Sequence, residues 1–350
     1  MSEIPMAPDL SSPPVAAATL HDVAQAAGVS LATASRVLNG STRRVAEAYR
    51  ERVQAAADRL GYTANLSAQA TARGTSAIVA LLVADIADPY FGQIAAGVAR
   101  GADEAGLVVT IAITERDPAR EVRVIRALRG QRPRGLILAA SRNLDHDAAD
   151  LSGELAALSA SGTRAVALGR GDGDVRWLAV DNHAGARELA SRMSALGYRR
   201  AIILAAAEGL RTSDDRIAGF TAGFTAGGAE EPRVLRGAFS RQGGIDLMAR
   251  ALEEGVDAGT LVFGISDVVA IGAMRAIRDA GRSVGADIAV CGFDDIPTSS
   301  DVTPALTTVR VPLDEIGYQA LHAAVTEDWS GPGDAVELTV VARESTPARS

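Results

Sequence analysis

The chain has 350 residues, of which 47% are hydrophobic, and its formal net charge is -8. At roughly 100–200 residues per domain, this length predicts two or three domains with enough apolar side chains for buried cores. No apolar run approaches the roughly 18 residues of a membrane-spanning helix, and residues 1–18 lack the pattern of a signal peptide. The single cysteine, Cys291, excludes an intramolecular disulfide. We therefore expect a cytoplasmic protein in which residues 1–18, rich in Pro, Ser and Ala, form a disordered leader.

Residues 19–62 have the pattern of three short helices. Thr19 and Asp22 stand in the spacing of a capping box, which predicts a helix that begins directly after Thr19. A glycine turn follows, and Ser30 can cap a second helix over residues 31–38. A third amphipathic helix completes the unit. Two short helices joined by a tight turn that contains glycine are typical of a helix-turn-helix motif.

The second predicted helix carries residues suited to reading DNA, because in this motif its first turns meet base edges in the major groove. Arg36 can donate two hydrogen bonds to guanine, whereas Leu31 and Ala32 can contact a thymine methyl group. Short donors suited to phosphate oxygens, together with the capping residue, complete the contacts expected here: Thr19, Ser30, Thr33, Ser35 and Asn39. Residues 19–75 carry seven Arg against four Asp or Glu, which favours a DNA partner. The alternative is a small helical bundle with an ordinary solvated arginine.

Residues 19–39, TLHDVAQAAGVSLATASRVLN, closely resemble the headpiece signature of the lactose-repressor (LacI/GalR) family. The resemblance implies a transcriptional repressor that binds a palindromic operator as a homodimer. Two positions depart from the family pattern. Ala34 stands where Val is usual, and Ala46 stands where Ser often caps the third helix, which predicts a weaker cap.

Residues 63–76 occupy the place of the family's hinge. There the resemblance implies a short helix that enters the minor groove of the operator and wedges a Leu side chain between base pairs. Thr71 occupies the wedge position in this sequence, and Gln69 replaces a usual Arg, so we expect weaker or altered kinking of the DNA. Asn65, Ala68 and Thr71 are the expected contacts. A plain flexible linker is the alternative.

From residue 77 onward, apolar runs alternate with helical patterns. The runs that read as buried parallel strands are 78–83, 107–113, 135–140, 165–168, 178–180, 201–206, 234–236, 261–263 and 288–291. Helical patterns such as 91–105 and 119–129 lie between them. Alternation of this kind predicts an α/β core of two doubly wound parallel-sheet lobes behind the all-α headpiece.

Ligands of open α/β sheets bind at the carboxyl ends of the strands, so the polar and aromatic residues that follow each strand are candidates. These residues are Asp85, Tyr90, Phe91, Arg170, Thr212, Arg216, Ser266, Asp267, Asp294 and Asp295. Carboxylates, a guanidinium and aromatic faces suit a sugar or a related small polar effector in a cleft between the lobes. Each residue also has a structural alternative: Asp85 and Asp294 as helix caps, Arg216 in a salt bridge within one lobe, Phe91 as core.

The family resemblance extends over residues 19–342 and implies a periplasmic-binding-protein-like core that dimerises. The positions that match effector contacts of the family are Tyr90, Phe91, Arg216, Phe263, Ser266, Asp267 and Asp294. Ser266 replaces a usual Asn, and Phe263 has core packing as its alternative. Three crossings between the lobes are implied, with lobes of about 77–176 plus 310–330 and 177–309 plus 333–342, and a tail over 343–350.

Three functions share parts of this pattern: a ligand-gated repressor, a solute-binding protein of a transporter, and an enzyme. The headpiece and the absence of a signal peptide count against the solute-binding protein. The four His residues are scattered and no nucleophile–base or metal-ligand spacing stands out, which counts against an enzyme, and we expect neither a metal nor a cofactor besides the effector. We therefore expect double-stranded operator DNA and a small-molecule effector as the partners, with no membrane.

Overall fold

The computed structural model describes residues 18–38, 45–63, 76–140, 148–169, 175–331 and 336–349. The chain divides into two compact units, Met1–Ser76 and Ala77–Ser350, which are described separately. Among the described residues, no helix has the length and apolar character needed to cross a membrane. The predictions for Asn39 and for the hinge residues Asn65, Ala68 and Thr71 lie outside the described residues.

The first unit contains α1 (Leu20–Ala27), α2 (Leu31–Leu38) and α3 (Glu47–Leu60). The predicted capping box is confirmed at α1, where the Thr19 hydroxyl accepts from the Asp22 N–H and the Asp22 carboxylate accepts from the Thr19 N–H. Gly28 ends α1 with a φ of 63°, a left-handed conformation that glycine adopts without strain. The predicted weaker cap of α3 is also confirmed, because Ala46 makes no side-chain hydrogen bond at its N-cap.

Small and β-branched side chains form the core of this unit. Val23, Ala34 and Val53, one from each helix, are fully buried. The α3 residue Arg52 donates through Nη2 to the Ala27 carbonyl oxygen and thereby satisfies a free acceptor at the end of α1. The inner face of α2 therefore packs in the core between α1 and α3, and its outer face is exposed.

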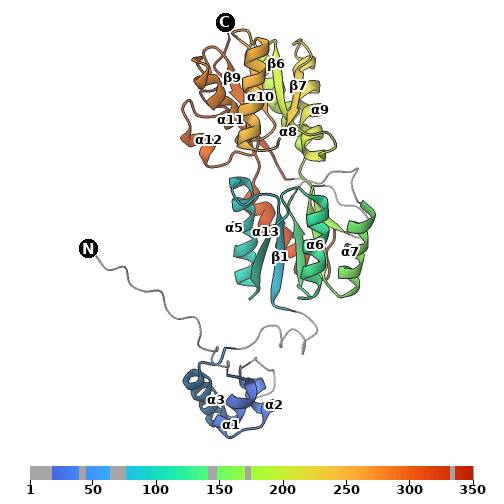
Figure 1. The fold of residues 1–350 in the computed structure, drawn as a ribbon, viewed down its shortest axis with the longest axis vertical. Helices are drawn as coiled ribbons and strands as arrows, with labels where there is room; N and C mark the ends of the chain where they lie inside the picture. Colours follow the sequence, from blue (N-terminus) through green and yellow to red (C-terminus); the bar gives the residue numbers. More distant parts are fainter. Residues whose placement is uncertain are drawn as a thin grey trace, which may run out of the picture. The chain divides into compact units, whose positions relative to one another are not determined.

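The second unit begins with the amino lobe, a parallel sheet of order β2-β1-β3-β4-β5. Its strands are β1 (Ile78–Val83), β2 (Val108–Ile113), β3 (Gly135–Leu138), β4 (Arg164–Leu168) and β5 (Arg176–Leu178). Helices α5 (Pro89–Glu104) and α13 (Leu313–Val325) pack on one face, and α6 (Pro118–Arg129) and α7 (Ala148–Ala160) on the other (Figure 1). Side chains of β1 alternate between these two layers, which explains why the whole strand is apolar.

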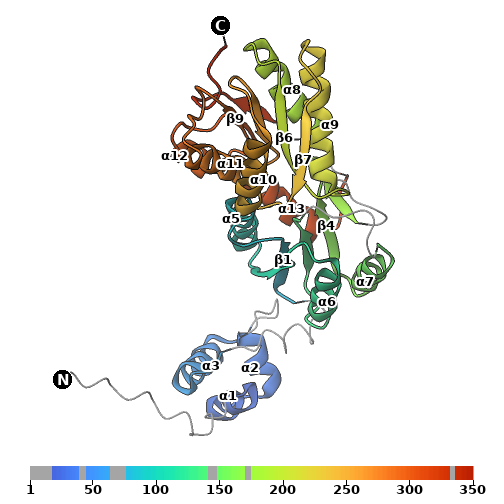
Figure 2. The same cartoon turned by 45° about the horizontal axis from the view of Figure 1, so that its top comes forward.

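The carboxyl lobe repeats this design with a parallel sheet of order β7-β6-β8-β9. Its strands are β6 (Ala201–Ala206), β7 (Arg233–Gly237), β8 (Leu261–Gly264) and β9 (Ala289–Cys291). Helices α8 (Asn182–Ala195) and α9 (Arg211–Ala226) pack together, as do α10 (Arg241–Glu254) and α11 (Asp267–Asp279) (Figure 2). A short helix, α12 (Thr298–Asp301), follows β9. The predicted fold class, two doubly wound parallel-sheet lobes behind a helix-turn-helix unit, is confirmed.

The chain crosses between the lobes three times. It passes from β5 to α8, from β10 (Thr308–Arg310) to α13, and from α13 back to β11 (Thr339–Val341), which pairs antiparallel with β10. Residues 343–349, expected to be a tail, lie against the carboxyl lobe instead. Ser345 is fully buried and its hydroxyl donates to the Val290 carbonyl oxygen at 2.6 Å. This segment completes the hydrogen bonding of β9, which sequence periodicity could not reveal.

Candidate DNA-reading helix and effector pocket

The outer face of α2 presents the predicted base-reading side chains. Leu31 is 49% exposed, and Ala32 and Arg36 are also exposed, whereas Ala34 is buried. Ala32 and Arg36 are four residues apart, so they lie on one face of the helix. Ser30 caps α2 by accepting from the Thr33 N–H at 3.2 Å. These residues have the arrangement of a helix that can enter a major groove.

Three of the predicted DNA contacts have structural duties in this unit. The Asp22 carboxylate accepts from the Thr19 N–H and from the Thr19 hydroxyl, and these two hydrogen bonds lower the pKa of Asp22. Ser30 and Thr33 share a hydrogen bond between their hydroxyl groups at 2.9 Å. These hydroxyl groups thus hold the helix starts in place, and a phosphate contact from any of them is an additional role.

A pocket in the second unit lies where the strands of both lobes end. Its lining residues lie at or after the ends of β1, β2, β3, β4 and β5 in the amino lobe and after β6, β7 and β9 in the carboxyl lobe: Asp88, Tyr90, Phe91, Arg116, Ala139, Leu168, Gly169, Val180, Asn182, Thr212, Arg216, Phe239 and Asp294. The space among them that no atom fills is about 540 Å³, including its open mouth. The strand-end rule applied to the sequence therefore leads to the pocket between the two lobes.

Arg216, on α9, organises the carboxyl-lobe side of this pocket. It is 2% exposed, and its Nε donates to Asn182 Oδ1 at 2.8 Å while its Nη1 donates to the Ile265 carbonyl oxygen at 2.6 Å. Its Nη2 donates to Asp294 Oδ1 at 2.8 Å, and its plane lies over the Phe293 ring. Because the protein engages all three nitrogens, Arg216 holds other pocket residues in position.

Asp294 is buried beside this guanidinium. Burial raises the pKa of Asp294 to about 8, although the charge of Arg216 acts in the opposite direction. Its backbone has a φ of 115° and that of Asp295 a φ of 56°, so two consecutive non-glycine residues lie in the left-handed half of the map. Strain of this kind persists only where surrounding contacts impose it and is concentrated at functional sites. Here the Asp294 N–H donates to the Val309 carbonyl oxygen at 2.8 Å.

The amino-lobe side of the pocket begins at the start of α5. Asp88 caps this helix by accepting from the Tyr90 N–H at 3.0 Å, and Pro89 occupies its first turn. Helix α5 therefore starts two residues earlier than the predicted 91–105. Asp88 and Pro89 set its beginning, and neither belongs to the apolar pattern from which the helix was predicted. Burial raises the pKa of Asp88. Tyr90 and Phe91 meet edge to face with 5.0 Å between ring centroids, which gives the pocket an aromatic wall.

Comparisons with known proteins match both units. A family model described as "Bacterial regulatory proteins, lacI family" matches residues 19–65, and one described as "Periplasmic binding protein-like domain" matches residues 190–346. The HTH-type transcriptional regulator GalR of Escherichia coli (strain K12) is 32% identical to this chain, covering 88% of each. The chain belongs to the lacI family of bacterial regulatory proteins. As a lacI-family protein it is a DNA-binding transcriptional regulator and not an enzyme.

Solved structures extend the likeness of this lacI-family protein to the whole fold. The lac repressor dimer bound to operator and the anti-inducer ONPF has a TM-score of 0.80 and 30% identity, covering 95% of this chain and 99% of that chain. A complex of the transcriptional regulator CelR with cellobiose has a TM-score of 0.67 and 30% identity, covering 94% and 99%. The family recognised in the headpiece sequence is thereby confirmed.

The lacI-family core brings together five of the predicted effector residues. Tyr90, Phe91, Thr212, Arg216 and Asp294 line the pocket, whereas Asp85, Phe263, Ser266, Asp267 and Asp295 do not, and Arg170 lies outside the described residues. Asp85 instead closes a turn, because its Oδ1 accepts from the Ala87 N–H at 2.9 Å. Phe263 is fully buried and stacks on Phe220 with 4.5 Å between ring centroids, since its side of β8 faces α9. Ser266 is 2% exposed at the start of α11, and its hydroxyl has no partner among the described residues.

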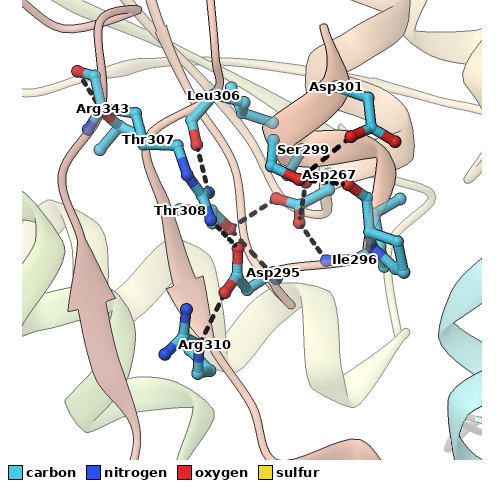
Figure 3. A network of polar contacts seen from close by, with 12 residues as sticks. Asp267, Asp295, Ile296, Ser299, Asp301, Leu306, Thr307, Thr308, Arg310 and Arg343 are labelled. Atoms are coloured by element: carbon cyan, nitrogen blue, oxygen red, sulfur yellow. Dashed lines mark hydrogen bonds and ion pairs between the residues drawn. The ribbon is translucent and has the colours of Figure 1, made fainter.

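Asp267 is a positioning residue and does not contact the pocket. This carboxylate is fully buried and accepts three hydrogen bonds, from Thr308 Oγ1 at 2.5 Å, Ser299 Oγ at 2.7 Å and the Ile296 N–H at 2.9 Å (Figure 3). Burial raises its pKa to about 7 although these donors act in the opposite direction. Asp267 therefore fixes the loop that follows β9, and Asp294 is part of that loop.

Asp295 ties the same loop to the crossing strands. Its Oδ2 accepts from Arg310 Nε and its Oδ1 from Arg343 Nη2, each at 2.7 Å (Figure 3). Arg343 also donates to the Leu306 carbonyl oxygen at 2.7 Å. Hydrogen bonds thus join the loop that carries Asp294 to β10 and to the last segment of the chain. Strand β10 precedes the second crossing between the lobes, and the last segment follows the third.

The sequence prediction missed four polar or aromatic pocket residues: Asp88, Arg116, Asn182 and Phe239. Arg116 and Phe239 follow β2 and β7, so the strand-end rule applied to every strand would have included both. Asn182 follows the predicted strand 178–180, so the same rule would have included it as well. Among the described residues, no group of three or more His, Cys, Asp or Glu side chains could hold a metal ion.

Proposed function

We propose that this lacI-family protein is a repressor that binds a palindromic operator as a homodimer and responds to a sugar or related small polar effector between its lobes. The observation that supports the effector class is the composition of the pocket. Two carboxylates, Asp88 and Asp294, two guanidinium groups, Arg116 and Arg216, and aromatic rings surround one space. Hydroxyl groups both donate and accept, so they suit such a mixture, and sugar ring faces pack on aromatic rings.

The proposed mechanism is a shift between two arrangements of the lobes. An effector that contacts both lobes favours the closed arrangement, and it can shift the equilibrium only by its difference in affinity for the two. In a dimer, a change in the lobes would alter the spacing of the two helix-turn-helix units, which a palindromic operator fixes. Relatives support this proposal, since the solved structures similar to this chain include a lac repressor dimer bound to operator and CelR with cellobiose.

The DNA half of the proposal can be tested without knowing the operator. Purified protein selects its sites from random double-stranded DNA, and the selected sequences are compared for two-fold symmetry. We expect two inverted half-sites and a dimer in light-scattering measurements. Selected sites without symmetry, or equal affinity for every sequence at moderate salt, would contradict the proposal.

The effector half is tested by a thermal-shift screen of neutral sugars and nucleobases, followed by operator binding with each hit. A ligand that binds the folded protein raises its unfolding temperature. We expect a sugar to raise that temperature and to change operator affinity. A screen in which only nucleobases do so would support a repressor with a different effector class.

A further inference from the structure

Arg116 and Phe239 contact each other across the two lobes. Arg116 lies between β2 and α6 in the amino lobe, and Phe239 lies between β7 and α10 in the carboxyl lobe. The guanidinium carbon is 4.4 Å from the centroid of the Phe239 ring, and Arg116 Nη1 donates to the Phe239 carbonyl oxygen at 3.4 Å. A cation over an aromatic face is attracted to it, so this pair favours the arrangement in which the lobes meet.

The backbone that holds Arg116 in this position has an unfavourable conformation. Glu115 and Arg116 have φ values of 55° and 56°, which side chains with a Cβ rarely adopt. Main-chain hydrogen bonds from Thr114 to the Val83 carbonyl oxygen and from Glu115 to the Ala84 carbonyl oxygen, at 2.9 and 3.0 Å, fix the loop to β1. The strain is therefore imposed by the sheet and directs one arginine to the pocket.

The Arg116 guanidinium has an unused donor. Its Nε is buried and has no hydrogen-bond partner among the described residues. The Asp88 and Asp85 carboxylates act on Arg116 through their charge, and neither accepts a hydrogen bond from its Nε. A buried N–H without a partner is costly, and a ligand that supplies an acceptor removes that cost.

The neighbouring charges define the acceptor. A carboxylate or phosphate of a ligand would satisfy Arg116 but would lie in the same pocket as the Asp88 carboxylate, whose negative charge would oppose it. A hydroxyl group can accept from Arg116 Nε and donate its own proton to a carboxylate. A neutral ligand with several hydroxyl groups therefore fits both kinds of residue.

We propose that Arg116 is a specificity-determining residue, which binds a hydroxyl oxygen of a neutral polyhydroxylated effector through Nε while it stacks on Phe239. This inference rests on the proposed function and deepens it. Because Arg116 contacts the effector and the opposite lobe together, its contribution to affinity is present only when the lobes meet. Arg116 thus supplies part of the difference in affinity that an effector needs to shift the lobes.

The test compares Arg116→Gln with Arg123→Gln by calorimetric titration of D-ribose, D-galactose, cellobiose and D-glucuronate. Arg123, on α6, has a side chain that is 65% exposed and does not line the pocket, so its variant controls for the loss of one arginine. We expect a neutral sugar to bind the wild type, Arg116→Gln to bind it about tenfold or more weakly, and Arg123→Gln to differ by less than about twofold. Unchanged affinity in Arg116→Gln, binding of glucuronate alone, or binding of no neutral sugar overturns the proposal.

A second variant separates the ligand contact from a general loss of structure. Phe239→Leu keeps the carbonyl acceptor and Arg116 but removes the ring. We expect it to weaken sugar binding as well, and the double variant to bind no more weakly than Arg116→Gln alone, because both changes remove one coupled interaction. Additive losses contradict the stacking. Selection of symmetric DNA sites by the wild type is measured separately, so a failure of the repressor assignment is distinguished from a failure of the Arg116 assignment.

Discussion

At the scale of single residues, the pocket contains two arginines with different duties. Arg216 gives every guanidinium nitrogen to protein acceptors, and the bond to Asp294 uses only one of the two oxygens of that carboxylate. Arg116 keeps its Nε without a protein partner among the described residues. Arg216 therefore orients the residues of the site, while Arg116 has a donor available to a ligand. The sequence alone does not distinguish them, because each is an arginine that follows a predicted strand.

Replacing Asp294 by Asn should remove the effector response while DNA binding stays intact. Asn tolerates the positive φ of this position better than most residues, so the fold should survive the change. We expect the affinity for the sugar to fall about tenfold or more, because the amide has one acceptor oxygen where the carboxyl group has two, and Arg216 already engages one of them. Operator binding measured by fluorescence anisotropy, with and without the sugar, checks this. Asp301→Asn, an exposed position on α12, is the control, and a normal response in Asp294→Asn would remove this residue from the site.

Replacing Arg36 by Ala should weaken operator binding by about 1–3 kcal/mol and relax specificity at one base pair. The reason is that Arg36 is exposed on the face of α2 that also presents Ala32. Affinity for the selected site and for random DNA is measured at one salt concentration. Arg50→Ala, an exposed arginine on α3, is the matched control. An equal loss on both kinds of DNA would mean that Arg36 contacts phosphates only.

At the scale of elements, close pairs of helices hold the amino lobe to the chain that returns from the carboxyl lobe. Helices α5 and α13 approach so closely that a Cβ at Gly97 would lie 1.8 Å from the Asp314 carbonyl oxygen, and a Cβ at Gly317 would lie 2.1 Å from the Ile94 carbonyl oxygen. Glycine is required here because two backbones meet. The contact joins residues more than 200 positions apart, and it packs the helix that follows the second lobe crossing against the first helix of the amino lobe.

Gly97→Ala should therefore destabilise the core domain by about 2 kcal/mol or more, since neither backbone can move away cheaply. Gly92, on the same helix, has nothing within 4 Å of an added Cβ, so Gly92→Ala should be neutral or stabilise by up to about 1 kcal/mol. Urea unfolding of both variants and the wild type makes the comparison. Equal stability of the two variants would contradict the close packing of α5 on α13.

At the scale of the whole molecule, buried carboxylates make stability depend on pH. Burial raises the pKa of Asp267 to about 7 and that of Asp294 to about 8 from the ordinary value of 3.8. A carboxyl group whose pKa is higher in the folded state stabilises the fold fully below the unfolded pKa and loses that contribution as the pH rises through the folded value. The free energy of unfolding should therefore decrease from acidic to mildly alkaline pH.

We expect the free energy of unfolding to be lower at about pH 8.5 than at about pH 5.5 by about 2 kcal/mol or more. Chemical denaturation at a series of pH values measures it. Asp294→Asn should flatten the dependence, because the amide does not titrate, while the exposed Asp301→Asn should leave it unchanged. A stability that rises over this interval would show that both carboxylates are charged throughout.

Much of the architecture could be predicted from the sequence because it depends on short-range chemistry. The Thr19 capping box, the span of α2 and the missing cap at Ala46 involve neighbours in the chain, and apolar runs of strand length indicated the parallel sheets. The strand-end rule reached Tyr90, Phe91, Thr212, Arg216 and Asp294, since parallel strands deliver their carboxyl ends to one edge.

Only the tertiary structure decided which candidates line the pocket and which support it. Phe263 and Phe239 are both aromatic residues near a strand end, but the face of β8 buries one and the loop after β7 brings the other to Arg116. Asp267 and Asp294 are both buried acids, yet three donors from distant segments engage only Asp267. Contacts of this kind join residues far apart in the chain, so their partners are set by how the two lobes pack and not by any local pattern.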